Sequence, residues 1–189
     1  MQKPNIPSNQ SGFTLVEVFL VVVIIGILGS YAVPAFREFF GSAEITRAQD
    51  ELANTLRLAR SSALGYSKPV IVCSSSDGNS CKTTNQTDWT SGWIVFLDCN
   101  EDGVRDVNDA TKECDMNNDD DTLDTEDDTE QLVKKQSEME MTLSATVGTI
   151  EFDEIGRLAT PGTFTLTSSS FDGTKTVAVN GYGRVTKSN

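Results

Sequence analysis

Between Asp98 and Asp109 the chain spaces oxygen-bearing side chains as a calcium loop does. Calcium takes about six to eight oxygen ligands, which alternate residues of a tight loop can supply, and a glycine at position six permits the sharp turn. With Asp98 as position one, Gly103 falls at position six and Val104 offers its backbone carbonyl at position seven. The spacing therefore predicts a structural calcium ion as cofactor, held by Asp98, Asn100, Asp102, Val104, Asp106 and Asp109.

The same loop opens an acidic insertion, residues 98–128, which carries 14 Asp and Glu against two basic residues. The whole chain of 189 residues has a net charge of -13, so almost all of its acidity lies in this segment. A solvated, self-repelling loop is the alternative account, because blocks of like charge usually remain hydrated. A less regular second pattern follows at Asp115, Asn117, Asp119, Asp121 and Glu126, with no glycine at its sixth position.

Glu17 is unusual for its position, because it is the single charged residue in the apolar run of residues 13–36. About 20 helical residues cross the roughly 30 Å hydrocarbon core of a bilayer, so this run is long enough to span a membrane. A carboxylate inside such a span costs about 2.5 kcal/mol or more and normally has a partner. The alternative is a position near the membrane surface, where the carboxylate reaches water.

The residues around Glu17 resemble a known processing signal. Gly12-Phe13-Thr14-Leu15-Val16-Glu17, followed by the apolar run, is similar to the type III signal of type IV prepilins and type II secretion pseudopilins. The resemblance implies that a prepilin peptidase cleaves after Gly12 and methylates the new terminal amine of Phe13. It also implies that Glu17 pairs with the terminal amine of a neighbouring pilin during filament assembly.

This resemblance sets the expected organisation of the chain. Residues 1–12 are the leader, 13–36 the transmembrane and filament-core helix, 37–66 its amphipathic continuation, and 67–189 a periplasmic head. The leader holds only Lys3 as a basic side chain, so the resemblance decides its cytoplasmic location more firmly than the charge bias does. We expect the protein to cross the bacterial inner membrane once and then to enter a pilus or pseudopilus.

The region after the apolar run predicts a helix and then strands. Pro34 is expected to kink the helix, and Gly65 with the Lys68-Pro69 step is expected to end it. Beyond Pro69, short β-prone runs at 70–73, 93–97, 139–143, 149–152, 164–167, 176–179 and 184–186 predict strands. The expected class is an α+β pilin fold, a long N-terminal helix packed on a mostly antiparallel sheet. Apolar residues at spacings of three and four mark its buried stripe: Ile45, Ala48, Leu52, Leu56, Ala59 and Ala63.

The order of motifs in the head resembles the GspH/FimT/FimU group of minor pilins and minor pseudopilins. The motifs are residues 92–98, Gly156-Arg157 after Phe152, residues 163–166 and 176–179, and Gly183-Arg184-Val185. The resemblance covers nearly the whole chain except residues 104–138. It implies a minor type IV pilin that helps to prime or cap a pilus, and the alternative is the H-type minor pseudopilin of a type II secretion system.

Four cysteines suit the oxidising periplasm that this topology implies, where an even number favours disulfides. Three pairings are possible, and we favour Cys73 with Cys81 and Cys99 with Cys114. A tetrathiolate zinc site is the alternative, although no close Cys-x-x-Cys pair is present.

Two further functional classes fit the sequence less well. A FimT-like DNA-uptake pilin would contact phosphate through its basic tail, here Arg184 and Lys187, but Thr186 replaces the second arginine of that pattern. A sequence pI near 4.3 also disfavours nucleic acid as a partner. The chain contains no His, no Gly-x-Ser-x-Gly and no P-loop, so it is not expected to be an enzyme.

Overall fold

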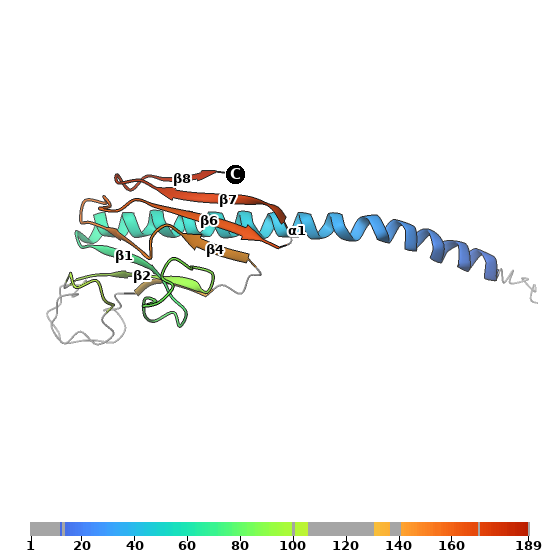
Figure 1. Cartoon of the computed structure of the whole chain (residues 1–189), viewed down its shortest axis with the longest axis horizontal. Helices are drawn as coiled ribbons and strands as arrows, with labels where there is room; N and C mark the ends of the chain where they lie inside the picture. Colours follow the sequence, from blue (N-terminus) through green and yellow to red (C-terminus); the bar gives the residue numbers. More distant parts are fainter. Residues whose placement is uncertain are drawn as a thin grey trace, which may run out of the picture.

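The structure is a computed structural model that describes Gly12 and residues 14–99, 101–105, 131–136, 141–169 and 171–188, without the side chains of 31–38, 131–136 and 171. Its first element is helix α1 (Leu15–Tyr66), which has 52 residues. The C-terminal half of α1 packs within the head, and its N-terminal half projects well beyond the head (Figure 1). We call residues Leu15–Ser30 of this projecting half the stem.

Both ends of α1 follow from local sequence. At the start, the backbone N–H of Glu17 donates to the side-chain oxygen of Thr14 at 3.3 Å, which makes Thr14 the N-cap. At the other end, Ser67 takes the left-handed C-cap conformation with φ 52°, so the helix ends at Tyr66, as the predicted bounds 37–66 require. The helix also runs through Pro34 without interruption, and the stem bends away from the axis of the head half (Figure 1).

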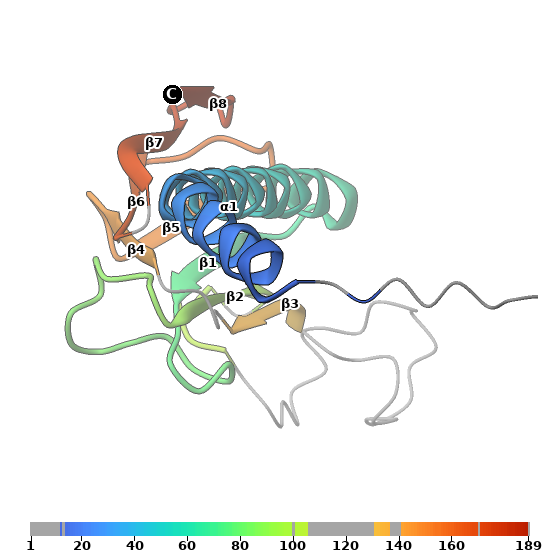
Figure 2. The same cartoon turned by 90° about the vertical axis from the view of Figure 1, so that its right-hand side faces the viewer.

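The described residues of the head form two four-stranded sheets, in which every strand pairing is antiparallel. The first sheet has the order β3-β2-β1-β5, and the second has the order β4-β6-β7-β8. Viewed along the helix, β1, β2 and β3 lie below α1, whereas β4, β6 and β7 lie to its left (Figure 2). The strands are β1 (Val70–Ser74), β2 (Gly92–Leu97), β3 (Gln131–Gln136), β4 (Met141–Ala145), β5 (Thr149–Phe152), β6 (Gly162–Ser168), β7 (Phe171–Val179) and β8 (Val185–Ser188).

The α+β pilin fold is therefore confirmed, but the single predicted sheet is wrong. The chain passes from the first sheet to the second after β3, returns at β5, and leaves again at β6. Strand β3 was not predicted, because its sequence QLVKKQ has neither an apolar run nor a regular alternation and its place depends on backbone pairing with β2. The strand predicted over 139–143 lies two residues later, at β4.

The main core lies between α1 and the two sheets. All six residues of the predicted helix stripe are fully buried there, which confirms the face that the spacing indicated. Strands β1 and β2 are buried throughout, because the face turned away from α1 also carries a small apolar cluster. Burial on both faces explains why these strands have nearly continuous apolar runs. The second cluster consists of Ile71, Cys73, Ile94 and Phe96, with Cys81 packed against it.

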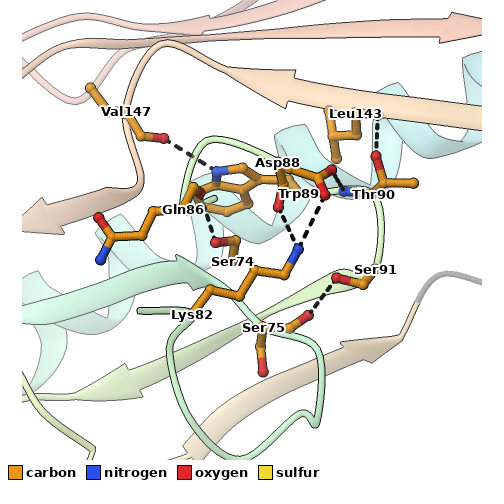
Figure 3. A network of polar contacts seen from close by, with 10 residues as sticks. All are labelled: Ser74, Ser75, Lys82, Gln86, Asp88, Trp89, Thr90, Ser91, Leu143 and Val147. Atoms are coloured by element: carbon orange, nitrogen blue, oxygen red, sulfur yellow. Dashed lines mark hydrogen bonds and ion pairs between the residues drawn. The ribbon is translucent and has the colours of Figure 1, made fainter. Parts of the chain in front are cut away.

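The loop between β1 and β2 ties the two sheets together (Figure 3). Trp89, from this loop, is fully buried and meets Phe164 of β6 edge to face, with ring centroids 4.8 Å apart. Its indole N–H donates to the carbonyl of Val147 at 3.2 Å, and its backbone N–H donates to Leu143 of β4 at 2.8 Å. A connection within the first sheet is thereby fixed to the second sheet.

Polar contacts hold the rest of this loop in place. Lys82 Nζ donates to the Asp88 carbonyl at 2.8 Å, and the Asp88 carboxylate accepts from the backbone N–H of Thr90 at 3.0 Å (Figure 3). The Thr90 side chain and then its backbone N–H make the largest contributions to lowering the pKa of Asp88, through hydrogen bonds to its carboxylate. The Ser74 hydroxyl donates to the Gln86 carbonyl at 2.7 Å, which closes the loop back onto β1.

Candidate assembly site and head loops

The stem presents apolar side chains to its surroundings along its whole length. Twelve large apolar residues between Leu15 and Leu28 are each 43–85% exposed. Contiguous apolar surface of this extent marks a contact with another protein or with a membrane. Within the described residues, no helix meets the length and apolarity needed to cross a membrane. The membrane span predicted for residues 13–36 stays a prediction.

The structure places Glu17 at the third position of α1, on the exposed surface of the stem. Thr14 and Glu17 form a Thr-x-x-Glu sequence, in which an N-cap side chain accepts from the backbone of the third helical residue. A carboxylate in the first turn also faces the positive end of the helix dipole, a contribution of about 0.3–1 kcal/mol. This helix cap was not predicted, although the Thr-x-x-Glu spacing is present in the sequence. Gly12 is exposed, and Phe13 lies outside the described residues.

The start of the acidic insertion folds around Asp98. Its carboxylate accepts from the backbone N–H groups of Asp102 at 3.1 Å and Gly103 at 3.0 Å. Gly103 has φ 77°, the left-handed conformation expected of position six in a calcium loop. Asp98 is only 3% exposed, and this burial raises the pKa of its carboxyl against the opposing effect of the backbone N–H groups of Gly103, Asp102 and Glu101.

Of the remaining predicted calcium ligands, the structure describes Asp102 and Val104. Asp102 and Val104 are close in the turn, where the Val104 N–H donates to the Asp102 carboxylate at 2.7 Å. Asn100, Asp106 and Asp109 lie outside the described residues, as does the second pattern from Asp115 onward. No group of three or more potential metal ligands of the His, Cys, Asp or Glu types occurs within the described parts of the chain. Calcium binding therefore stays a prediction.

The disulfide between Cys73 and Cys81 is confirmed. It closes a loop in which the Asp77 carboxylate accepts from the backbone N–H of Asn79 at 2.8 Å and of Ser80 at 2.9 Å. These N–H groups hold the pKa of Asp77 well below its ordinary value. Cys99 is also disulfide-bonded, whereas Cys114, its predicted partner, lies outside the described residues.

The two basic residues of the C-terminal tail have different environments. Arg184 is exposed, whereas the Lys187 ammonium forms an ion pair with Asp50 of α1. Next to this pair, the buried side-chain amide of Gln49 donates to the carbonyls of Thr176 and Ser188, each at 2.8 Å. Gln49 and Lys187 together thus fasten β8 to α1, and the ion pair engages Lys187, one of the two predicted phosphate contacts.

This fastening can be tested with Gln49→Leu protein. The substitution removes the amide that both carbonyls accept from, and losing a buried hydrogen-bond partner costs about 1–3 kcal/mol. We expect faster hydrogen exchange at the amides of residues 185–188 in the full-length protein in detergent micelles, with exchange in β1 and β2 unchanged. Asn54→Leu, on the exposed side of α1, serves as the control. Unchanged exchange in β8 would show that Gln49 does not hold the strand.

Comparisons with known proteins agree with this architecture. A family model described as type II transport protein GspH matches residues 48–183, and one described as a prokaryotic N-terminal methylation motif matches residues 7–33. The solved structure of the type IV minor pilin FimU from Pseudomonas aeruginosa is 17% identical to this chain. It superimposes with a TM-score of 0.50 over 80% of this chain and 92% of that chain, which is a similarity of fold.

Curated relatives match over shorter stretches. A fimbrial protein of Pseudomonas aeruginosa is 39% identical over 62 residues, which cover 33% of this chain and 40% of that protein. The type IV major alpha-pilin of Moraxella bovis is 46% identical over 44 residues, 23% of this chain and 28% of that protein. The chain therefore matches less than half the length of these relatives.

The matched regions correspond to the parts of the structure described above. The methylation motif includes Gly12, Glu17 and the stem, and the GspH match begins at Ala48 and ends at Gly183, so it spans the packed half of α1 and most of the head. Pilins are structural proteins that assemble with other pilins into filaments. The chain belongs to the GspH family and carries a prepilin-type methylation motif at its N-terminus.

Proposed function

We propose that this chain is a minor subunit of a type IV pilus, held in the filament by its stem, and that it helps to prime or cap assembly. The observation that carries the proposal is the exposed apolar stem beyond a head that already has a closed core. At about 1.5–3 kcal/mol for each fully buried large side chain, covering twelve half-exposed residues is worth on the order of 10–20 kcal/mol. The stem therefore needs a continuous apolar cover, which the membrane supplies before assembly and neighbouring stems supply in the filament.

The methylation motif supports a specific sequence of events. A prepilin peptidase cleaves after Gly12 in the inner membrane and methylates the amine of Phe13. The stem then holds the protein in the membrane as a single pass, with the head in the periplasm, until it joins other pilins in the filament. Glu17 pairs with the terminal amine of a neighbouring subunit, which neutralises a charge that the apolar surroundings would otherwise disfavour.

A second candidate is the H-type minor pseudopilin of a type II secretion system, which the description of the matched family favours. Deleting the chain should have different effects in the two systems, because one assembles surface pili and the other secretes proteins. In the bacterium that encodes it, deletion is expected to reduce surface pili and twitching while secreted enzymes still reach the medium. Accumulation of those enzymes in the periplasm, with normal piliation, would overturn the pilus assignment in favour of the pseudopilus.

Calcium is proposed as a structural ion of the acidic insertion, held by Asp98, Asn100, Asp102, Val104, Asp106 and Asp109. The loop around Asp98 supports this, because its carboxylate is fixed at the start of the turn and Gly103 takes the conformation that such a loop requires. Bound calcium would supply positive charge to a segment that carries almost the whole net charge of the protein.

Calorimetric titration of the full-length protein in detergent micelles tests the ion. We expect calcium to bind with a dissociation constant of roughly 10⁻⁴–10⁻³ M, the range of extracellular modules, and chelator to lower the melting temperature. Asp109→Ala protein should lose both effects, and Asp172→Ala, an exposed aspartate of β7, should keep them. Absence of calcium-dependent heat in the unmodified protein would contradict the proposal.

A further inference from the structure

The turn between β7 and β8 contains the only Asn-Gly step in the sequence, Asn180-Gly181. Asparagine is among the less durable side chains of proteins, because its amide can be lost without an enzyme. In that reaction the backbone nitrogen of the next residue attacks the side-chain carbonyl carbon, and ammonia leaves. A glycine in the next position has no Cβ to hinder the attack. Whether the step reacts in the folded protein depends on how the turn holds these two residues.

The carbonyl that would be attacked is held by two backbone donors. The Asn180 side-chain oxygen accepts from the N–H groups of Tyr182 at 3.1 Å and Arg184 at 3.0 Å. Negative charge develops on this oxygen when its carbon is attacked, and donors that are already in place stabilise such charge. Asn180 is exposed, so water can reach the amide group that leaves as ammonia. The turn therefore prepares the Asn180 amide as an electrophile.

The attacking atom, the backbone nitrogen of Gly181, is not engaged elsewhere. Within the described parts of the chain, the Gly181 N–H donates no hydrogen bond. The Gly181 carbonyl, in contrast, accepts from the Leu158 N–H at 3.0 Å, which fixes this residue beside the first sheet. The nitrogen can therefore lose its proton to hydroxide and attack without breaking a contact of the fold.

A second turn, which follows β5, shows that an aspartate fits in place of Asn180. There the Asp153 carboxylate accepts from the N–H groups of Ile155 at 3.1 Å and Arg157 at 2.7 Å. The same two backbone hydrogen bonds close both turns, and each turn has a left-handed glycine, with φ 70° in the first and 71° in the second. Aspartate at position 180 would therefore keep all four hydrogen bonds of the turn.

The alternative product, isoaspartate, does not fit this turn. It arises when water opens the cyclic imide at its other carbonyl, and it lengthens the main chain by one carbon. Gly183 has no room to shift, because a Cβ atom on it would lie 2.3 Å from the Gly156 carbonyl oxygen and 2.6 Å from Arg60 Nε. Arg60 Nε also donates to that carbonyl at 3.0 Å, which holds the neighbouring turn in place. The fold therefore favours normal aspartate.

We infer that Asn180 is a site of spontaneous deamidation in the folded head, and that the turn directs the reaction to normal aspartate. The amide carbon exchanges its bond to nitrogen for a bond to the oxygen of water, so one amide and one water give one carboxylate and one ammonium ion. The new carboxylate accepts from the backbone of Arg184 and lowers the net charge of the basic tail by one. The charge of the tail then depends on the age of the protein. This inference does not depend on the proposed function.

The test follows the full-length protein in detergent micelles during incubation at slightly alkaline pH. Peptide mass spectrometry measures deamidation at each asparagine, and an isoaspartate-specific methyltransferase distinguishes the two products. We expect Asn180 to react roughly 10-fold faster than Asn79 and Asn85, exposed asparagines of the β1–β2 loop, because donors on a developing oxyanion accelerate reactions by at least that factor. The rate at Asn180 should be no lower in the folded protein than in guanidinium, where isoaspartate should be the main product.

Two variants test the role of the turn. Gly181→Ala should keep the turn, because a Cβ atom there lies 3.6 Å from the nearest atom, the Leu158 carbonyl oxygen, and its methyl group should slow the reaction roughly 10-fold. Asn180→Asp, the product itself, should melt at the temperature of the unmodified protein. The inference is overturned if Asn180 reacts no faster than Asn79 and Asn85, if folding slows its reaction, or if isoaspartate is the main product in the folded protein. An unchanged rate in Gly181→Ala protein would also overturn it.

Discussion

Glu17→Ala protein is expected to insert into the membrane normally and to enter filaments about 100-fold less than the unmodified protein. Without this carboxylate, the charged terminal amine of the neighbouring subunit stays unpaired in apolar surroundings, and breaking a buried ion pair costs about 3–5 kcal/mol. The role of Glu17 at the start of α1 contributes only about 0.3–1 kcal/mol, too little for a defect of this size. Immunodetection in membranes and in sheared filaments measures the two steps separately.

Two further variants separate charge from local structure. Glu17→Gln keeps the shape of the side chain and removes its charge, so it should fail as Glu17→Ala does. Glu44→Ala changes a carboxylate of the same helix outside the stem and should assemble normally. If Glu17→Gln protein enters filaments at the normal level, Glu17 does not act by pairing with the terminal amine, and only its role at the start of the helix remains.

Trp89→Ala is expected to cause the largest loss of stability from a single substitution in the head, about 3–5 kcal/mol. The indole is fully buried, and its removal leaves a cavity beside Phe164 and a Val147 carbonyl without its N–H donor. Because Trp89 joins the β1–β2 loop to the second sheet, we expect the two sheets to lose cooperativity. Thermal unfolding of the full-length protein in detergent micelles measures the change.

Two control variants, a conservative substitution of Trp89 and a substitution on the surface, test this interpretation. Trp89→Phe keeps most of the apolar volume and should recover more than half of the loss, although it cannot donate to Val147. Tyr182→Ala removes an aromatic ring that is 72% exposed and should leave the melting temperature nearly unchanged. If Trp89→Ala melts within a degree or two of the unmodified protein, the indole does not connect the sheets.

Local periodicity predicted the helical part of this molecule well. The stripe of Ile45, Leu52 and Leu56 with the small residues between them repeats at helical spacing, and every member is buried as expected. The disulfide of Cys73 with Cys81 was also within reach, because the two residues flank a short loop with a turn signal and the compartment favours oxidation. Glu17 was conspicuous because a single charge interrupts a long apolar run.

Features that depend on distant pairing were not predictable in the same way. The sequence QLVKKQ of β3 becomes a strand because β2 offers it a partner edge, and no property of those six residues alone indicates this. The contacts of Trp89 with Leu143 and Phe164 of the second sheet join residues that are more than 50 positions apart in the chain. The ion pair of Lys187 with Asp50 joins residues separated by 137 positions, so a tail that looks free in sequence is fastened to α1.

Two similar turns, one after β5 and one between β7 and β8, also involve a contact that the sequence does not predict. Asp153 and Asn180 both begin the same turn, and the sequence Asx-x-x-Gly-Arg repeats at the two sites, so the similarity could have been noticed. What the spacing alone could not provide is their contact through Arg60, which comes from a third part of the chain.

Mass spectrometry of the chain recovered from sheared filaments tests the central claim most directly. A filament subunit processed at the predicted site begins at N-methylated Phe13, with the leader of residues 1–12 removed. We predict that this species is present in filaments and that the uncleaved chain is confined to the membrane. Filaments without the chain, or filaments containing the chain with its leader intact, would contradict the account.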